Sequence, residues 1–182
     1  METAGPVIRP AGISDAPAIA AVHVAAWRAA YTTLMDPAYL AGFTHHASTR
    51  RWREILAAGH PDSRVLVVVE DGALTGFSAV GRPHDAVPTG VGQLYAINVH
   101  PDRWGTGLGA QLLTQSQRAL TQLGYRAAYL WVASGNIRAI DFYLQHGWTS
   151  DGITKWDNEF HPPIPEDRMS ITLTEHDSRP RR

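Results

Sequence analysis

The spacing of apolar residues near the start of the chain predicts a short strand, residues 7–9, followed by an amphipathic helix. Apolar residues recur there every three or four positions, the period of a helix that buries one face. They are Ile19, Val22, Ala26 and Ala30. Asp15 precedes them as a helix N-cap, and Pro17 falls in the first turn, where a missing N–H is harmless. A second helix is predicted over residues 49–58, because Gly59 follows where helices commonly end.

Two runs of β-branched residues, 64–70 and 73–80, indicate a β-hairpin. They are joined through Asp71-Gly72, a dipeptide that favours a tight hairpin turn. Residues 81–90 are rich in proline, glycine and aspartate and predict a loop. Another strand is predicted over residues 91–99.

The second half of the chain alternates helices and strands. A helix that stops at Gly124 carries leucines inward. These are Leu108, Leu112, Leu113, Leu120 and Leu123. Residues 125–132 predict a strand apolar enough to be buried on both faces, and a helix follows over 136–147. Residues 149–165 predict a long irregular link before a last strand over 168–173.

This order of elements predicts one α+β domain over residues 1–174, with a mixed, mostly antiparallel central sheet flanked by helices. A chain of 182 residues is long enough to bury one substantial core. Residues 175–182 form a polar tail, which we expect to be disordered.

A glycine-rich turn, Gly-Thr-Gly-Leu-Gly over residues 105–109, leads from the strand of residues 91–99 into the next helix. Glycines let the backbone bend sharply and leave its N–H groups uncovered by side chains. Such donors at the positive end of a helix dipole predict a site for phosphate or pyrophosphate. The lysine of a P-loop is missing, and the spacing differs from that of dinucleotide-binding turns. A closely packed helix start without a ligand is the alternative.

Residues 136–148 carry a second motif, Asn-Ile-Arg-Ala-Ile-Asp-Phe-Tyr followed by Leu-Gln-His-Gly-Trp. Together the two motifs resemble the GNAT superfamily of acyl-CoA-dependent N-acyltransferases. The turn matches its Arg/Gln-x-x-Gly-x-Gly/Ala pyrophosphate-binding pattern. The second motif matches its Asn-x-x-Ala-x-x-Phe-Tyr-x-x-x-Gly-Phe helix, with Trp148 in place of the usual Phe. The order and separation of the motifs fit too, and the resemblance covers roughly residues 7–173.

The resemblance implies acetyl-CoA as co-substrate and implies which residues hold it. Main-chain groups of residues 97–99 would pair with the pantetheine arm like an added strand, and the Val99 N–H would donate to the thioester oxygen. Residues 104–110 would surround the pyrophosphate, and Asn136 would hold the pantetheine amide. The residues expected to bind the cofactor are Ile97, Asn98, Val99, Trp104, Gly105, Thr106, Gly107, Leu108, Gly109, Ala110, Asn136 and Tyr143.

Trp104 departs from the family pattern, which has Arg or Gln at this position. A cationic or amide contact is therefore missing unless Arg103 turns inward to replace it. Because backbone N–H groups supply most of the site, we expect weaker binding rather than none. Trp104 could stack on adenine or pack beneath the loop, and we expect packing.

Tyr143 is the expected catalytic residue. Asn136 and Tyr143 are seven residues apart, two helical turns, and therefore share one helix face. The expected buried stripe is Ile137, Ile140 and Leu144, with Arg138, Asp141 and Gln145 in water. A phenol with a pKa of about 10 can protonate a thiolate whose thiol has a pKa of about 8.5, given hydrogen-bond reach. An aromatic anchor for packing is the alternative role.

The group that deprotonates the acceptor amine is not evident. Family members often carry Glu early in the fourth strand, but the aligned residue is Gln93, which cannot titrate and is expected only to contact the acceptor. Alternative bases are His23, His84, Asp85, Tyr95 and a chain of waters, and solvent is a further one. Trp27 and Tyr31 share with His23 a second stripe of the first helix. This stripe favours either an aromatic pocket for the acceptor or packing against the next helix.

Composition excludes several other functions. The formal net charge of −1 gives no electrostatic reason to expect a nucleic acid or a membrane as partner. Neither a secretory signal nor a membrane-spanning apolar run is evident, so we expect a cytoplasmic protein. The lack of cysteine excludes a thiol nucleophile. His45-His46 lacks a third ligand at metal spacing and is expected in a loop, so no metal is predicted. Pairing through an edge strand into a homodimer stays open.

We therefore expect an N-acetyltransferase that transfers the acetyl group of acetyl-CoA to a primary amine by direct attack, with Tyr143 as general acid. The chain has no cysteine and no evident Ser-His-Asp arrangement, which favours the direct route. The acceptor, a small molecule or a peptide, is not identified by the sequence. A non-catalytic acyl-CoA-binding regulatory module on the same fold is the alternative, favoured by Gln93 and opposed by Tyr143. A nicotinamide enzyme is a third hypothesis.

Overall fold

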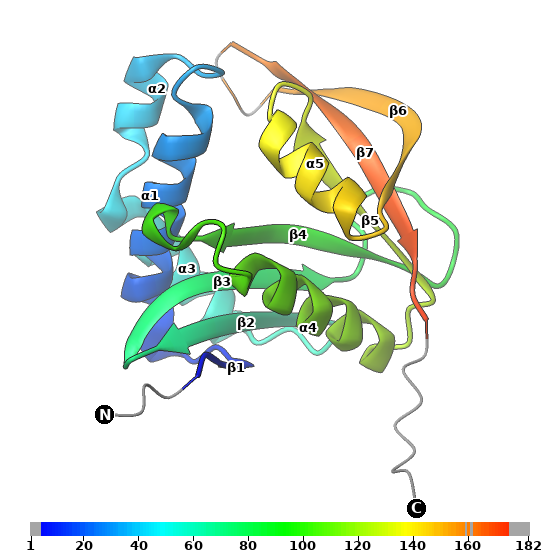
Figure 1. Cartoon of the computed structure of the whole chain (residues 1–182), viewed down its shortest axis with the longest axis horizontal. Helices are drawn as coiled ribbons and strands as arrows, with labels where there is room; N and C mark the ends of the chain where they lie inside the picture. Colours follow the sequence, from blue (N-terminus) through cyan, green and yellow to red (C-terminus); the bar gives the residue numbers. More distant parts are fainter. Residues whose placement is uncertain (1–4, 159, 161, 175–182) are drawn as a thin grey trace, which may run out of the picture.

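The computed structural model describes residues 5–158, 160 and 162–174. A seven-stranded sheet in the order β1-β2-β3-β4-β5-β7-β6 forms its centre, with helices on both faces (Figure 1). The strands are β1 (Val7–Pro10), β2 (Ser63–Glu70), β3 (Ala73–Gly81), β4 (Val91–Val99), β5 (Ala127–Ala133), β6 (Thr149–Asp157) and β7 (Ile164–Thr172). The helices are α1 (Ala16–Tyr31), α2 (Pro37–Gly42), α3 (His45–Ala58), α4 (Leu108–Gln122) and α5 (Ile137–Gln145). The predicted α+β fold class is confirmed.

The β2–β3 hairpin turns through Asp71-Gly72, as the sequence predicts. Both turn residues have positive φ, 48° at Asp71 and 80° at Gly72, which matches the right-handed twist of the two strands. The hairpin is covered on both faces. Val67 and Phe77 pack against α1 and α3, whereas Val68 packs against α4.

The residues of β6 correct the prediction of a long irregular link. Residues 149–157 pair with β7 as the edge strand of the sheet. Most of their side chains are exposed, so no alternation of apolar and polar residues marks the strand. Gly152 has a φ of 79°, and the register shifts between Ser150 and Thr154, which interrupts the strand further.

Two helix starts also differ from the sequence prediction. α2 was not expected; the Asp36 carboxylate caps it by accepting from the backbone N–H of Ala38 at 2.7 Å. α3 begins at His45, four residues before the predicted start, with Thr44 as its N-cap. The prediction of a loop for His45-His46 is therefore wrong. Both helices begin with polar or proline-containing turns that lack an apolar stripe, so periodicity alone misses them.

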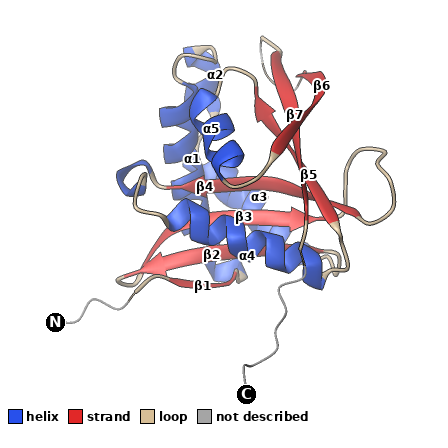
Figure 2. Ribbon diagram, turned by 45° about the vertical axis from the view of Figure 1, so that its right-hand side comes forward, coloured by secondary structure: helices blue, strands red, loops and turns tan. Residues whose placement is uncertain are grey.

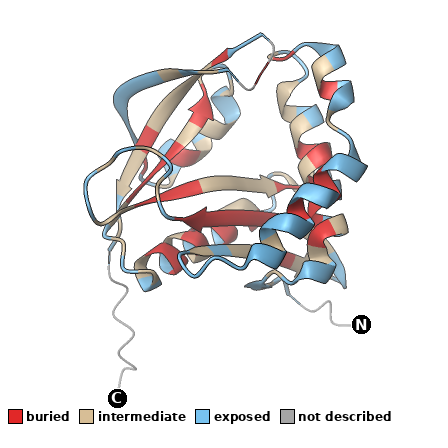
Figure 3. Cartoon of the chain, turned by 180° about the vertical axis from the view of Figure 1, so that it is seen from behind, coloured by how far each residue is buried: buried red, intermediate tan, exposed pale blue. Residues whose placement is uncertain are grey.

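The strands β4 and β5 part from each other, and this separation positions the candidate site. They pair in parallel only between residues 91–93 and residues 127–129. Beyond these residues β4 continues beside β3, while β5 turns away beside β7 (Figure 2). Burial is concentrated on β3 and β5 and on the helix faces against the sheet (Figure 3).

None of the described helices is long and apolar enough to cross a membrane. The predicted polar tail, residues 175–182, lies outside the described residues.

Candidate functional site

The free edge of β4 carries unpaired backbone groups. His100 N donates to Thr75 O of the neighbouring strand end at 2.8 Å. Antiparallel partners alternate between bonded and non-bonded pairs, so the backbone groups of Val99 and Ile97 point away from β3. β5 has already diverged at these positions. Of the residues named from the sequence, Ile97 and Val99 thus turn their backbone groups toward the space between β4 and β5, while Asn98 lies between them. The Val99 carbonyl already accepts a hydrogen bond from Trp104 Nε1.

The loop after β4 presents a row of backbone donors. Gly105 and Gly107 have φ values of 77° and 86°, which turn successive N–H groups to one side. Within the described part of the chain, none of the six amides of residues 105–110 has a hydrogen-bond acceptor. A Cβ built on Gly105 or Gly107 would meet no atom within 4 Å. The loop is therefore an open cradle of N–H donors, as the sequence predicts.

α4 begins at this loop and adds the positive end of its dipole. Gly107 is its N-cap, so the N–H groups of Leu108, Gly109 and Ala110 belong to the first helical turn, which lacks internal partners. Gly109 has a packing role besides, because a Cβ there would lie 3.4 Å from the Phe142 ring of α5. Anions are favoured at such a helix start.

Trp104 packs beneath the loop, as expected. Its Nε1 donates to Val99 O at 2.8 Å, and the side chain packs against the cluster that includes Val99 and Leu108. Arg103 does not replace the missing family arginine, because its guanidinium is bound to the Glu70 carboxylate at 2.6 and 3.0 Å.

Arg138 supplies a positive charge beside Trp104. Its guanidinium carbon lies 3.3 Å from the centroid of a Trp104 ring, a cation–π contact. Burial lowers the pKa of Arg138. Arg138 is exposed, as the sequence predicts, and its guanidinium also stacks on the indole, because α5 begins next to the glycine loop. The sequence offers one signal for this contact, the aromatic residue in place of the family arginine.

Tyr143 is the buried residue of α5, with 8% of its surface exposed. The predicted stripe is wrong, because Ile137 and Leu144 are 59% and 50% exposed. Burial, followed by the neighbouring Tyr31 hydroxyl, raises the pKa of Tyr143. The phenol therefore stays protonated at neutral pH, the state that an acid requires.

Tyr31 of α1 joins this group. Asn136 caps α5 by accepting from Ala139 N at 3.2 Å. Burial raises the pKa of Tyr31, and a hydrogen bond with the Asn136 side chain opposes that rise. Tyr31, Asn136 and Tyr143 thus form one neighbourhood beside the parted strands.

Gln93 is held in a hydrogen-bond network. Its Oε1 lies 2.8 Å from the Tyr129 hydroxyl and accepts from His84 N at 2.9 Å. The Tyr129 hydroxyl is also 2.8 Å from Asp85 Oδ2, which accepts from Trp131 Nε1 at 2.8 Å. Burial favours a higher pKa for Asp85, but the bonds from Trp131 and Tyr129 and nearby positive charges outweigh it, so its pKa is lowered. A lowered pKa makes Asp85 a weak base.

The other bases considered from the sequence are also engaged. His23 accepts from Trp52 Nε1 at 3.1 Å, and burial lowers its pKa to about 4, with the charge of Arg51 adding to the shift. The Tyr95 hydroxyl donates to Arg82 O at 2.5 Å, and burial raises its pKa to about 12. The His84 ring stacks on Tyr95, with centroids 4.6 Å apart.

Trp27 belongs to an aromatic packing cluster. Its ring stacks on Phe43 with centroids 4.9 Å apart and lies 5.6 Å from Phe160. Of the stripe shared by His23, Trp27 and Tyr31, the first two therefore pack against other aromatic rings. Tyr31 alone reaches the Asn136 side chain.

Sequence reasoning missed a carboxylate near Tyr31. Glu166 lies near the start of β7, and its charge contributes to the raised pKa of Tyr31. Its side chain is 14% exposed, and Lys155 Nζ lies 3.6 Å from its Oε2. No sequence signal was available, because the last strand was predicted to begin only at residue 168.

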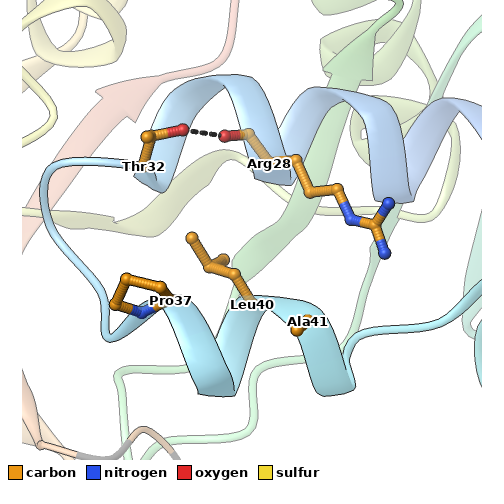
Figure 4. A pocket seen from close by; sticks show the side chains of 5 residues that line it. All are labelled: Arg28, Thr32, Pro37, Leu40 and Ala41. Carbon is orange, nitrogen blue, oxygen red and sulfur yellow. Dashed lines mark hydrogen bonds between the residues drawn. The ribbon is translucent and has the colours of Figure 1, made fainter.

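An open cavity of about 410 Å³ lies between the end of α1 and α2 (Figure 4). Its lining residues are Arg28, Thr32, Pro37, Leu40 and Ala41. No residue predicted to bind cofactor lines it. Among the described residues no group of three metal-ligating side chains is found.

Comparison with known proteins identifies the family. Residues 27–148 match the Acetyltransferase (GNAT) family. The chain is 29% identical to the uncharacterized N-acetyltransferase YuaI of Bacillus subtilis over 75% of this chain and 76% of that protein. It is 28% identical to the mycothiol acetyltransferase of Pseudarthrobacter chlorophenolicus over 86% of this chain, which spans about half (47%) of that relative.

Solved structures share the fold. The paia N-acetyltransferase of Thermoplasma acidophilum, solved with coenzyme A, superposes with a TM-score of 0.73 at 16% identity, covering 93% of this chain and 99% of that one. The yncA protein of Salmonella typhimurium, solved with its cofactor acetyl-CoA, gives a TM-score of 0.70 at 20% identity, covering 97% and 99%. With residues 27–148 matched, the chain belongs to the GNAT family of acetyltransferases.

Proposed function

We propose that this protein transfers the acetyl group of acetyl-CoA to a primary amine by direct attack. The observation that carries the proposal is the row of six amides, residues 105–110, which have no acceptor among the described residues and lie at the start of α4 beside the free edge of β4. Two structural neighbours were solved with coenzyme A or acetyl-CoA, which supports the same ligand here. The acceptor is proposed to be a small-molecule or peptide amine.

The residues of the site fit this co-substrate. The amides of residues 105–110 would bind the diphosphate, because they combine unpaired donors with a helix start. The guanidinium of Arg138 would add a charge at the same loop, where the family arginine is replaced by Trp104. The backbone groups of Ile97 and Val99 would hold the pantetheine arm as an added strand. The Val99 N–H would stabilise the thioester oxygen as it gains charge, an interaction that is typically worth about 3 kcal/mol.

Tyr143 would protonate the departing thiolate. Its hydroxyl stays protonated at assay pH, because burial raises its pKa. The surrounding apolar residues restrict water, which strengthens a hydrogen bond to a developing charge. Asn136 and Tyr31 lie in the same neighbourhood and would orient the pantetheine arm and the acceptor.

A non-catalytic acyl-CoA-binding module is the second candidate, favoured by one observation. Gln93, aligned with the family's catalytic glutamate, cannot titrate and is held by Tyr129 and His84. Both candidates would bind coenzyme A at the loop amides, but only the enzyme would transfer the acetyl group to an amine.

The test measures release of free coenzyme A from acetyl-CoA against a panel of primary amines that includes spermidine, tyramine, glucosamine and a peptide with a free N-terminus. We expect turnover with at least one amine, and we expect Tyr143→Phe to lower kcat about 100-fold or more, the usual effect of losing a general acid. Coenzyme A should still bind this variant in a thermal-shift assay, because the amides of residues 105–110 are retained. Binding of coenzyme A without turnover of any amine would establish the module instead.

A further inference from the structure

Glu166 lies on the same face of the sheet as Ala133, against whose cluster Tyr31 packs. It pairs in register with Ala133 of β5, so both side chains point to one face. Ala133 packs there in a cluster with Met35 and Leu40 and against Tyr31, from α1, α2 and the chain between them. This face is opposite to the one covered by α5, where Leu130 and Val132 pack with Tyr143.

An ammonium group already lies against this carboxylate. Lys155, the one lysine of the chain, places its Nζ 3.6 Å from Glu166 Oε2 and 4.3 Å from the centroid of a Trp131 ring. A carboxylate and an aromatic face together are a favourable setting for a cationic amine. The Lys155 ammonium thus makes the two contacts, with a carboxylate and with an aromatic face, that an acceptor ammonium would need.

The environment of Glu166 favours a basic carboxylate. Burial raises its pKa, the charges of Asp157 and Asp85 raise it further, and Lys155 opposes them. The charge of Glu166 also raises the pKa of Tyr31, which neighbours Asn136 and the buried Tyr143. Geometry links the carboxylate to Tyr31 through Ala133, which pairs with Glu166 and belongs to the cluster against which Tyr31 packs.

We propose that Glu166 is the general base of the acetyl transfer, taking a proton from an acceptor that binds as a cationic primary ammonium. The proposal rests on the proposed function and deepens it by naming the charge of the acceptor. Gln93 would then be a neutral neighbour of the acceptor, and the base would come from a different strand.

The proton balance is as follows. The Glu166 carboxylate accepts one proton from the ammonium and later releases it to solvent. The neutral amine nitrogen forms a bond to the acetyl carbon, and the carbon–sulfur bond breaks. The second proton lost by the nitrogen ends on the coenzyme A sulfur, with Tyr143 giving its proton to the sulfur and regaining one from the nitrogen.

The first test compares Glu166→Gln with Asp167→Asn. Gln keeps the size of the side chain and an oxygen for Lys155, so the fold should be retained. Asp167 is the next residue of β7, points to the opposite face and accepts from Thr154 Oγ1 at 2.7 Å. With the best amine of the panel, we expect Glu166→Gln to lose about 100-fold or more in kcat/KM at pH 7. Coenzyme A affinity should be unchanged, and Asp167→Asn should resemble the wild type.

The second test uses the pH profile, which a merely structural role would not move. In the wild type log kcat/KM should rise with pH through the titration of Glu166, and this acidic limb should disappear in Glu166→Gln. The charge of Lys155 lowers the pKa of Glu166, so Lys155→Met should move the limb to higher pH. Wild-type rates in Glu166→Gln, or a limb unmoved by both variants, would overturn the assignment while leaving the acetyltransferase intact. If the wild type binds coenzyme A and acetylates no amine, the proposed function and this inference both fail.

Discussion

Gly107→Ala tests whether the loop amides bind the diphosphate. Gly107 has a φ of 86°, and a Cβ there would meet no atom within 4 Å. Alanine therefore introduces backbone strain without a clash, at a cost of about 1–2 kcal/mol. Its methyl group would, however, occupy the open side of the cradle, where we place the diphosphate.

Gly124→Ala is a matched control at the other end of α4. Gly124 has a φ of 90° and is equally open, with no atom within 4 Å of a built Cβ. Both variants should lose roughly 2–8 °C in Tm, because each kcal/mol shifts the Tm of a domain of this size by about 2–4 °C. Strain alone therefore affects both variants equally.

Only Gly107→Ala should lose cofactor affinity. Losing one hydrogen bond to a charged group costs about 1.5–3 kcal/mol, equivalent to a rise in the Kd of coenzyme A of roughly 10- to 150-fold. Isothermal titration calorimetry measures this Kd in the wild type and in both variants. Equal affinities for all three proteins would refute a cradle at Gly107, and an equal loss in both variants would attribute the effect to strain.

Two further predictions address the charge beside the loop and the buried histidine. Arg138→Ala should raise the Kd of coenzyme A about tenfold, because it removes the guanidinium stacked on Trp104. Arg118→Ala, on the exposed face of α4, is the control and should leave this Kd unchanged. The same Kd in both variants would contradict the prediction. His23 has a pKa lowered to about 4, so the unfolded chain binds its proton first and stability should fall as pH drops from about 6.5 to about 4. In His23→Gln the amide oxygen can still accept from Trp52, but the residue no longer titrates. Between pH 7 and pH 4.5 the free energy of unfolding, measured with urea, should therefore decrease by roughly 2–3 kcal/mol less in this variant than in the wild type. The same pH dependence in both proteins would disprove the linkage.

The sequence predicts the parts of the fold that short-range chemistry determines. The Asp71-Gly72 turn, the strand of residues 91–99 and the helix that stops before Gly124 all carry local signals, and the structure has them there. The glycine loop also has the open backbone that its composition predicts. β6 was missed because an exposed edge strand buries too little to impose a pattern.

Contacts between distant segments could not be predicted. The face of α5 was assigned wrongly, because Ile137 and Leu144 follow a helical period and are nevertheless exposed. The position of Tyr143 in the core depends on where β5 and α4 lie, and no periodicity within nine helical residues contains that information. Arg138 on Trp104 and Glu166 near Tyr31 likewise join elements that the chain brings together only after folding.

A crystal structure of the protein with coenzyme A tests the central claim most directly. We predict diphosphate oxygens at about 2.7–3.2 Å from backbone nitrogens of residues 105–110, and the sulfur beside the Tyr143 hydroxyl. A ligand bound elsewhere, or a diphosphate held without these amides, would contradict the account.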